Sequence, residues 1–179
     1  MKRLLFVLVA VAVLSMVVAA QAADHKYIGA AACKMCHKAQ FDVWAGTAHA
    51  KAMETLKGEA AAKAATAKGL KVPASEAPEC LKCHQTAFGA DAALLDAKFD
   101  KAQGVQCESC HGAGGDYKAI ATMKDKAKAV AAGLTVYSVA DGSAEKFCVK
   151  CHNSESPTFK EFKFAESWDK IKHPKPAAK

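Results

Sequence analysis

The feature that most constrains this chain is a pentapeptide, Cys-x-x-Cys-His, which occurs four times. The copies read CKMCH, CLKCH, CESCH and CVKCH, and they begin at Cys33, Cys80, Cys107 and Cys148. Together they use all eight cysteines of the chain and four of its seven histidines. Neither a disulfide framework nor a zinc ribbon requires a histidine directly after every cysteine pair. The pattern therefore argues against both of these ordinary interpretations of a cysteine-rich chain.

The pentapeptide is the attachment signal of a c-type haem. Two thiols on one helical turn add across the two vinyl groups of the haem, and the adjacent histidine lies under the ring with its imidazole towards the iron. The sequence thus predicts four covalently bound c-type haems and their iron. The predicted attachment residues are Cys33, Cys36, Cys80, Cys83, Cys107, Cys110, Cys148 and Cys151, and the predicted proximal iron ligands are His37, His84, His111 and His152.

Three histidines lie outside the pentapeptides, and they are His25, His49 and His173. Four irons cannot all obtain a second histidine from this set, so one haem must take a methionine, accept a ligand from another chain or stay open to small molecules. We predict His49 and His173 as distal ligands, against the alternatives of a capping or surface histidine and a helix-end histidine. His25 and Met123 are further candidates, although Met123 also fits simple helix packing.

The N-terminus predicts export from the cytoplasm. Lys2 and Arg3 precede an apolar run over residues 4–20, and Ala20-Gln21-Ala22 fits the small-x-small rule of a secretory cleavage site. We expect residues 1–22 to be a signal peptide and residues 23–179 to be one tetrahaem cytochrome domain in the periplasm. The alternative is an uncleaved membrane anchor, because the run is near the lower length limit of a spanning helix. Only that form would involve a membrane.

Composition and spacing predict an irregular all-α fold of short helices wrapped around the four haems. Aromatic residues make up 7% of the chain, so the polypeptide alone would bury a thin core. The formal net charge is +7, and we interpret the excess of lysines as counter-charges to the negative haem propionates. We therefore expect no nucleic-acid binding. The motif spacing is not a regular repeat. The run LTVYSV is too short and isolated to make a sheet.

Local signals place the expected helices between the motifs. Two helices should follow the first motif, with Gly46-Thr47 separating them, Thr47 as an N-cap and Gly69 as the end. A further helix should follow Asp116 as its cap and end at Gly133. The last helix should end before His173-Pro174.

Four segments carry a resemblance to a known family. The segments CHKAQFDVWAGTAHAKAMETLK, CLKCHQTAFG, GVQCESCHGAGG and FKFAESWDKIKHP resemble the cytochrome c-554 family of tetrahaem cytochromes. The resemblance implies an all-helical monomer with haems in closely stacked pairs, which passes electrons from a hydroxylamine-oxidising enzyme towards the membrane chain. It also implies three haems with two histidine ligands each and a five-coordinate haem at the second motif.

Carried over by position, the resemblance assigns His49 to the fourth haem and His173 to the third, and it leaves the iron on His84 open. The family's remaining distal histidine follows the third motif, but residues 112–146 contain no histidine here. The haem on His37 must then use His25, Met123 or Tyr117, or be open as well.

Two classes of function remain after these considerations. The first is a soluble carrier that passes electrons between respiratory redox partner proteins, because closely spaced haems with filled axial positions suit electron transfer without bond chemistry. The second is a reductase of nitric oxide, hydroxylamine or nitrite at the open iron on His84. Turnover there would need proton donors, and the nearby sequence offers Gln85, Thr86 and Glu79. We favour the carrier over an enzyme and assign no catalytic residue.

A membrane-tethered quinol-oxidising protein and a filament subunit, in which a neighbouring chain supplies the missing ligand, are further alternatives. The first requires residues 1–22 to stay attached to the protein.

Overall fold

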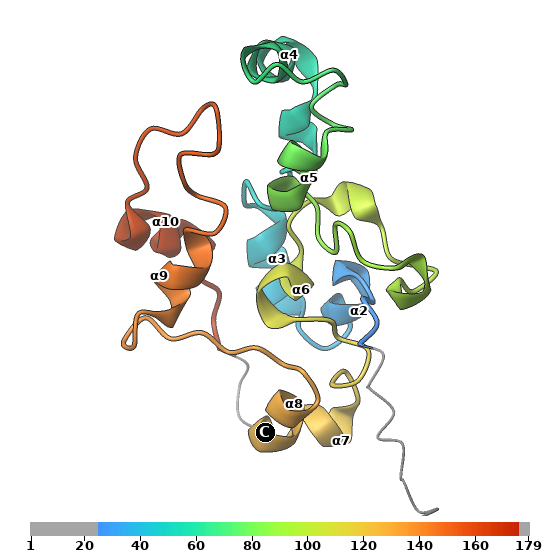
Figure 1. Ribbon diagram of the computed structural model, residues 1–179. Helices are drawn as coiled ribbons and strands as arrows, with labels where there is room; N and C mark the ends of the chain where they lie inside the picture. The colour runs from blue at the N-terminus through green and yellow to red at the C-terminus, as the bar shows by residue number, and fades with distance from the viewer. Residues whose placement is uncertain (1–24, 176–179) are drawn as a thin grey trace, which may run out of the picture.

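The computed structural model describes residues 25–175, so the expected signal peptide lies outside the described residues. The described part is helical, and its β-structure is limited to one isolated bridge between Tyr27 and Leu95. The predicted all-α class is confirmed (Figure 1). No helix within this part is both long enough and apolar enough to cross a lipid bilayer. The elements are α2 (Ala30–Lys34), α3 (Lys38–Ala45), η1 (Glu54–Leu56), α4 (Gly58–Ala67), α5 (Pro78–His84), η2 (Ala92–Leu94), η3 (Lys101–Gln103), α6 (Cys107–His111), α7 (Ile120–Met123), α8 (Lys126–Ala131), α9 (Ser143–Cys148) and α10 (Phe164–Ile171).

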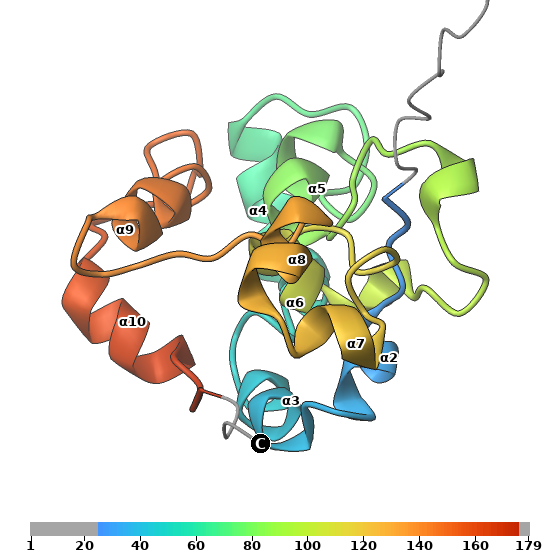
Figure 2. The ribbon, with the colours of Figure 1, turned by 90° about the horizontal axis from the view of Figure 1, so that it is seen from below.

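The helices are arranged around a central pair, α2 and α6, which contact each other. In Figure 1, α4 and α5 lie above this pair, and α7 and α8 lie below it. Helices α9 and α10 lie together on one side of the molecule in both views (Figures 1 and 2). The run LTVYSV forms the extended connection from α8 to this side and is not a strand, as expected.

The expected pair of helices after the first motif is α3 and α4, but Thr47 is not an N-cap. The Thr47 hydroxyl donates to the Trp44 carbonyl at 2.7 Å, and residues 47–53 form successive turns. The reason is a contact distant in sequence: the His49 carbonyl accepts the N–H groups of both Ala52 (3.2 Å) and Val105 (3.0 Å). That carbonyl is therefore not available to a regular helix.

Two glycines end helices as predicted. Gly69 has a φ of +68° after α4, where Leu70 N–H donates to the Ala65 carbonyl at 3.0 Å. Gly133 has a φ of +100° after α8, where Leu134 N–H donates to the Ala129 carbonyl at 2.9 Å. Both closures follow the Schellman pattern, which requires a left-handed residue that glycine adopts at little cost.

The prediction of one helix capped by Asp116 is wrong. The segment divides into α7 and α8, and the side chain of Asp125 caps α8 by accepting from Lys128 N–H at 3.1 Å. Aspartate favours caps over helix interiors because its short side chain competes for backbone N–H groups. Asp116 instead pairs with His25, with 2.6 Å between Oδ2 and Nδ1.

The buried apolar residues are mainly small. Among residues 25–175, nine of the twelve buried apolar residues are alanines, and the largest fully buried side chains are the polar Gln106 and Thr86. One local apolar cluster joins α4 to α5 through residues Leu56, Ala61, Ala65 and Ala74, with Met53, Leu70, Cys80 and Leu81 packed against it. Small side chains let the backbone segments approach one another closely, as the thin core predicted from the composition requires.

Hydrogen bonds connect the segments that carry the first, second and third motifs. Thr86, just after the second motif, accepts Gln106 N–H at 2.7 Å and donates to the Gly104 carbonyl at 2.9 Å. The Gln106 side chain in turn accepts from Ala30 N–H at 2.8 Å. The first, second and third motifs are thereby held against each other by fully bonded polar groups.

Candidate haem-binding site

Each Cys-x-x-Cys-His segment forms a helical turn. The second motif ends α5, which begins with Pro78 at its first turn, and the third motif is the whole of α6. In the first and fourth motifs, the histidine N–H donates to the carbonyl of the first cysteine, at 2.9 Å for His37 and 3.0 Å for His152. All eight cysteines are free thiols. The turn and the free thiols are what haem attachment requires of the polypeptide.

The four attachment segments lie next to one another. The side chains of Cys33 and Cys107 lie close to each other, and so do those of Cys83 and Cys151. Burial, with Cys148 nearby, raises the pKa of Cys110 to about 11. Burial, with Cys83 nearby, raises the pKa of Cys151 to about 12. Because a thioether carries no charge, such surroundings favour an attached sulfur over a thiolate.

Two pairs of imidazole rings face each other. The ring centroids of His49 and His152 are 6.0 Å apart, and those of His111 and His173 are also 6.0 Å apart. In a haem with two histidine ligands, the distance between the ring centroids is the sum of two iron–nitrogen bonds of about 2 Å and the two distances from nitrogen to ring centroid. This sum is close to the observed separation, so each pair fits one iron between its rings. The pairs join the fourth and third motifs to the two histidines that sequence reasoning selected as distal ligands.

The motif histidines are also oriented by their neighbours. His111 Nδ1 lies 3.0 Å from the Thr135 carbonyl, and His84 Nδ1 lies 2.9 Å from the Ala52 carbonyl. Since a carbonyl only accepts, each Nδ1 must carry the proton, which leaves Nε2 free to bind a metal. The ring of His152 stacks on Phe162 with a centroid separation of 4.6 Å.

Burial favours the neutral form of three histidines in these pairs, which are His49, His111 and His152. Burial lowers the pKa of His49, and the nearby His152 lowers it further. Burial is also the first cause of the lowered pKa values of His111 and His152. A neutral imidazole is the form that ligates iron. The protonation state therefore agrees with the facing geometry.

The two other proximal candidates have no such partner. Within residues 25–175, no second imidazole faces His37 or His84 at the separation found in the two pairs. His25 lies beside Asp116, and its ring atoms lie 3.2 Å from where a Cβ on Gly133 would be. The buried Tyr117 donates its hydroxyl to the Gly112 carbonyl at 2.8 Å, and Met123 lies half-buried in α7.

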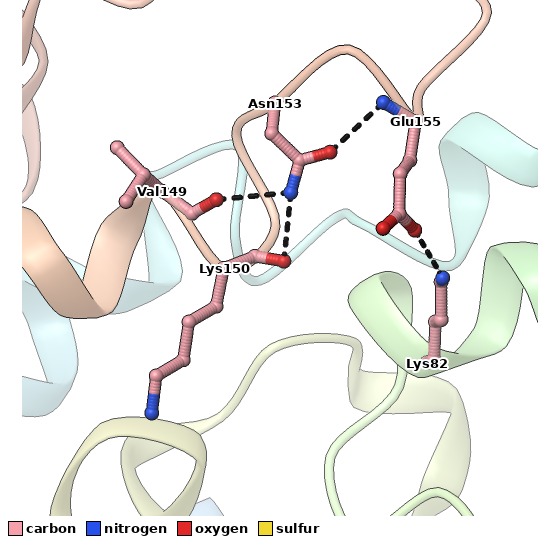
Figure 3. A network of polar contacts seen from close by, with 5 residues as sticks. All are labelled: Lys82, Val149, Lys150, Asn153 and Glu155. Carbon is pink, nitrogen blue, oxygen red and sulfur yellow. Dashed lines mark hydrogen bonds and ion pairs between the residues drawn. The ribbon is translucent and has the colours of Figure 1, made fainter.

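An ion pair that the sequence did not predict joins the second and fourth motifs. Lys82, inside the second motif, pairs with Glu155, which follows the fourth motif (Figure 3). Asn153 shapes this loop by donating to the carbonyls of Val149 (2.9 Å) and Lys150 (3.0 Å) and by accepting Glu155 N–H at 2.9 Å. The hydrogen bond with Glu155 raises the pKa of Lys82 and lowers that of Glu155. Both side chains are exposed, so the pair contributes geometry more than stability.

A second residue that sequence reasoning missed is Glu108, inside the third motif. Its side chain is 2% exposed and accepts backbone hydrogen bonds from Ile28, Gly29 and Gly114. Of the four motifs, only the third carries an acidic residue between its cysteines. This difference between the motifs was visible in the sequence and could have marked Glu108 as a residue with a special role.

Four haem-attachment turns placed side by side on an all-helical scaffold, with two facing imidazole pairs, define a tetrahaem c-type cytochrome. Comparison with known proteins agrees. Residues 32–112 match the family model described as "Cytochrome c554 and c-prime". The chain is thus similar to the cytochrome c554 family, and the comparisons support the resemblance to that family that the sequence carries.

Two relatives support this assignment. Cytochrome c-554 of Nitrosomonas europaea is 40% identical over 101 residues, which are 54% of this chain and 43% of the relative. The match thus spans less than half the length of that relative. The solved structure of the reduced state of cytochrome c554 from Nitrosomonas europaea aligns with a TM-score of 0.57 and 28% identity, covering 81% of this chain and 82% of that one. These comparisons support the predicted haem c cofactors and a c-type cytochrome of the electron-transfer class.

Proposed function

We propose that this cytochrome is a periplasmic carrier that passes electrons between respiratory redox partner proteins. The observation that supports this most is the continuity of the attachment segments. The first motif contacts the third through Cys33 and Cys107, and the second contacts the fourth through Cys83 and Cys151. Cys110 and Cys148 then connect the third motif to the fourth. Four haems held in this order form one uninterrupted path for electrons.

In this proposal the eight motif cysteines hold the haems, and His37, His84, His111 and His152 are the proximal ligands. His49 is the distal ligand of the fourth haem and His173 that of the third, on the strength of the two facing pairs. Irons with both axial positions filled change charge without binding a substrate, which suits a carrier. When bound, the haems supply one-electron chemistry, and the polypeptide supplies their spacing and ligands.

The carrier acts as a monomer outside the cytoplasm in this proposal. The sequence of residues 1–22, with its basic start and Ala-x-Ala site, supports export. Many of the chain's lysines lie on exposed positions, where they give redox partners a basic surface to dock on. The partners are respiratory proteins that donate and accept single electrons.

The second candidate function is a small-molecule reductase at the haem on His84. It is favoured by one observation, that no imidazole within residues 25–175 faces His84. Turnover would also need a proton donor on the open side of the iron. Thr55 contacts His84 at Nδ1, the ring nitrogen that does not bind the iron, and its hydroxyl donates to the Ala52 carbonyl at 2.7 Å, so Thr55 does not serve as that donor. We therefore favour the carrier.

The experiment that separates the two functions uses the haem-loaded protein. The reduced protein is mixed with nitric oxide, hydroxylamine or nitrite and, separately, with an oxidised c-type cytochrome as a generic acceptor. A carrier reduces the cytochrome rapidly and completely, and it is not consumed by the small molecules over repeated turnovers. Sustained turnover of any of the three small molecules, abolished by His84→Ala, would establish the reductase instead.

A further inference from the structure

Glu108 holds a buried negative charge at the junction of two attachment sites. Its Oε1 accepts the N–H groups of Ile28 (2.9 Å) and Gly114 (2.7 Å), and its Oε2 accepts that of Gly29 (2.8 Å). Ile28 N–H also lies 3.1 Å from Oε2. Both oxygens accept from N–H donors, and hydrogen bonds of this kind favour the carboxylate form.

The surroundings are built for this carboxylate. A Cβ at Gly114 would lie 2.9 Å from the Ile28 side chain and 3.2 Å from Glu108 Oε1, so a larger residue there would require the Ile28 side chain to shift. Two backbone segments, the N-terminal segment and the loop after α6, thus converge on one side chain of α6.

No cation neutralises this charge within residues 25–175. Lysine and histidine form ion pairs elsewhere in this part of the molecule, but none reaches Glu108. Backbone N–H dipoles compensate it only in part, and a buried charge without a partner is costly. A positively charged neighbour that is present only in the complete cytochrome would offset that cost. A ferric haem, whose iron carries one charge more than its porphyrin balances, is such a neighbour.

The charge acts on the first and third attachment sites. Glu108 follows Cys107 directly, and the Cys107 side chain lies close to that of Cys33. After Cys107 and burial, the charge of Glu108 is a further cause of the raised pKa of Cys33. After burial and Cys33, it also raises the pKa of Tyr117. The negative field therefore reaches Cys33 in the first motif and Tyr117 in the segment after the third.

The other motifs carry different residues at the same position. The residue after the first cysteine is Lys34 in the first motif, Leu81 in the second and Val149 in the fourth. Lys34 is exposed, so water and salt screen its charge. The second and fourth motifs each carry a lysine at the next position, which are Lys82 and Lys150.

We propose that Glu108 sets the reduction potentials, holding the haems of the first and third motifs below those of the second and fourth. This inference rests on the proposed haem attachment. Reduction brings one electron from a redox partner to a ferric iron and makes it ferrous, with no bond formed or broken. The site loses one positive charge in that step, so a buried carboxylate beside it favours the ferric form. Electrons then flow from the first and third haems to the second and fourth.

The test compares two glutamate-to-glutamine variants of the haem-loaded protein in a spectroelectrochemical titration. Glu108→Gln removes the buried charge, and Glu79→Gln removes an exposed charge directly before Cys80. At a fixed potential, Glu108→Gln should raise the ferrous-to-ferric ratio by roughly tenfold in one or two of the four haems, which is about 59 mV for a one-electron couple. Glu79→Gln should change no haem by more than about twofold, because its charge is screened. Four unchanged potentials in a Glu108→Gln protein that carries four haems would overturn the proposal.

A third variant separates charge from packing. Glu108→Asp keeps the charge but shortens the side chain, so it should leave the potentials near those of the native protein even if the protein becomes less stable. A potential shift in Glu108→Asp as large as that in Glu108→Gln would show that packing, not charge, is responsible.

The native protein offers a measurement that needs no variant to fold. With ¹³C-labelled glutamate, the reduced-minus-oxidised infrared spectrum should contain a carboxylate stretching band that shifts on reduction of the lowest-potential haems. No carboxylate band in that step would contradict the proposal. These results are independent of the carrier function, because a protein that fails to reduce a partner cytochrome can still show the Glu108 effect.

Discussion

Replacing Gly104 by alanine tests how the structure positions His49, the proposed distal ligand of the fourth haem. Gly104 has φ +70° and ψ −137°, and a Cβ there would lie 2.6 Å from the His49 carbonyl oxygen and 3.0 Å from Ala52 N. The positive φ costs about 1–3 kcal/mol for a residue with a side chain. The contact is with backbone atoms, so it can be relieved only by moving the turn that carries His49, at a further cost of about 1–3 kcal/mol.

The matched control for this prediction is Gly89→Ala. Gly89 has a similar φ of +78°, but a Cβ there meets nothing within 4 Å. Both variants therefore bear a cost for a positive φ, but only Gly104→Ala adds the contact with the His49 carbonyl. We expect the free energy of unfolding in denaturant, followed by circular dichroism of the haem-loaded protein, to be lower in Gly104→Ala by about 1–3 kcal/mol.

The EPR spectrum of the ferric haems provides a second measurement on the same two variants. Displacing the His49 turn moves its ring away from His152, so Gly104→Ala should convert part of one low-spin ferric haem to high spin in the EPR spectrum, whereas Gly89→Ala should not. Equal losses of stability in the two variants, with identical EPR spectra, would refute the reasoning that this contact holds His49 in place.

Three further predictions concern ligands and local stability. His49→Ala should convert one low-spin haem to high spin while four haems stay covalently bound, and His25→Ala should leave that signal intact; an unchanged EPR spectrum in His49→Ala would show that His49 is not a ligand. Asp125→Ala removes the cap of α8 and should lower the free energy of unfolding by about 1 kcal/mol, measured by thermal denaturation. Trp44→Phe removes the 2.8 Å bond from the indole N–H to the Val105 carbonyl and should cost about 1–2 kcal/mol, and a loss below about 0.3 kcal/mol would mean that water replaces the bond.

Short-range patterns predicted the parts of the molecule that depend on neighbouring residues. The pentapeptides need only a helical turn, and each of them forms one. Gly69 and Gly133 end their helices because a left-handed residue after a helix is a local requirement. The all-α class follows from the same local rules, since the alanine- and lysine-rich segments between motifs have no competing strand signal.

Contacts between distant segments were not predictable in this way. Thr47 satisfied the local rules for a cap, but Val105 binds the carbonyl of His49 and prevents the helix that Thr47 would begin. Asp116 satisfied the same rules and pairs instead with His25. The sequence singles out Glu108 as the one acidic residue between motif cysteines, but its burial is decided by Ile28 and Gly114, which only the fold brings to it.

The proposed distal ligands were predictable only in part from the sequence. The sequence limits the choice to three histidines, and resemblance to the family matched two of them with particular haems. The facing pairs in the structure agree with that assignment, because His49 meets His152 and His173 meets His111. Spacing along the chain could not have produced these pairs, since each spans a large part of the molecule.

The most direct test of the central claim is the intact mass of the protein purified from a host that matures c-type cytochromes. The account predicts a polypeptide that begins at Ala23 and carries four covalently attached haems. A mass with fewer than four haems would contradict the tetrahaem assignment, and a mass that retains residues 1–22 would contradict the proposed periplasmic carrier.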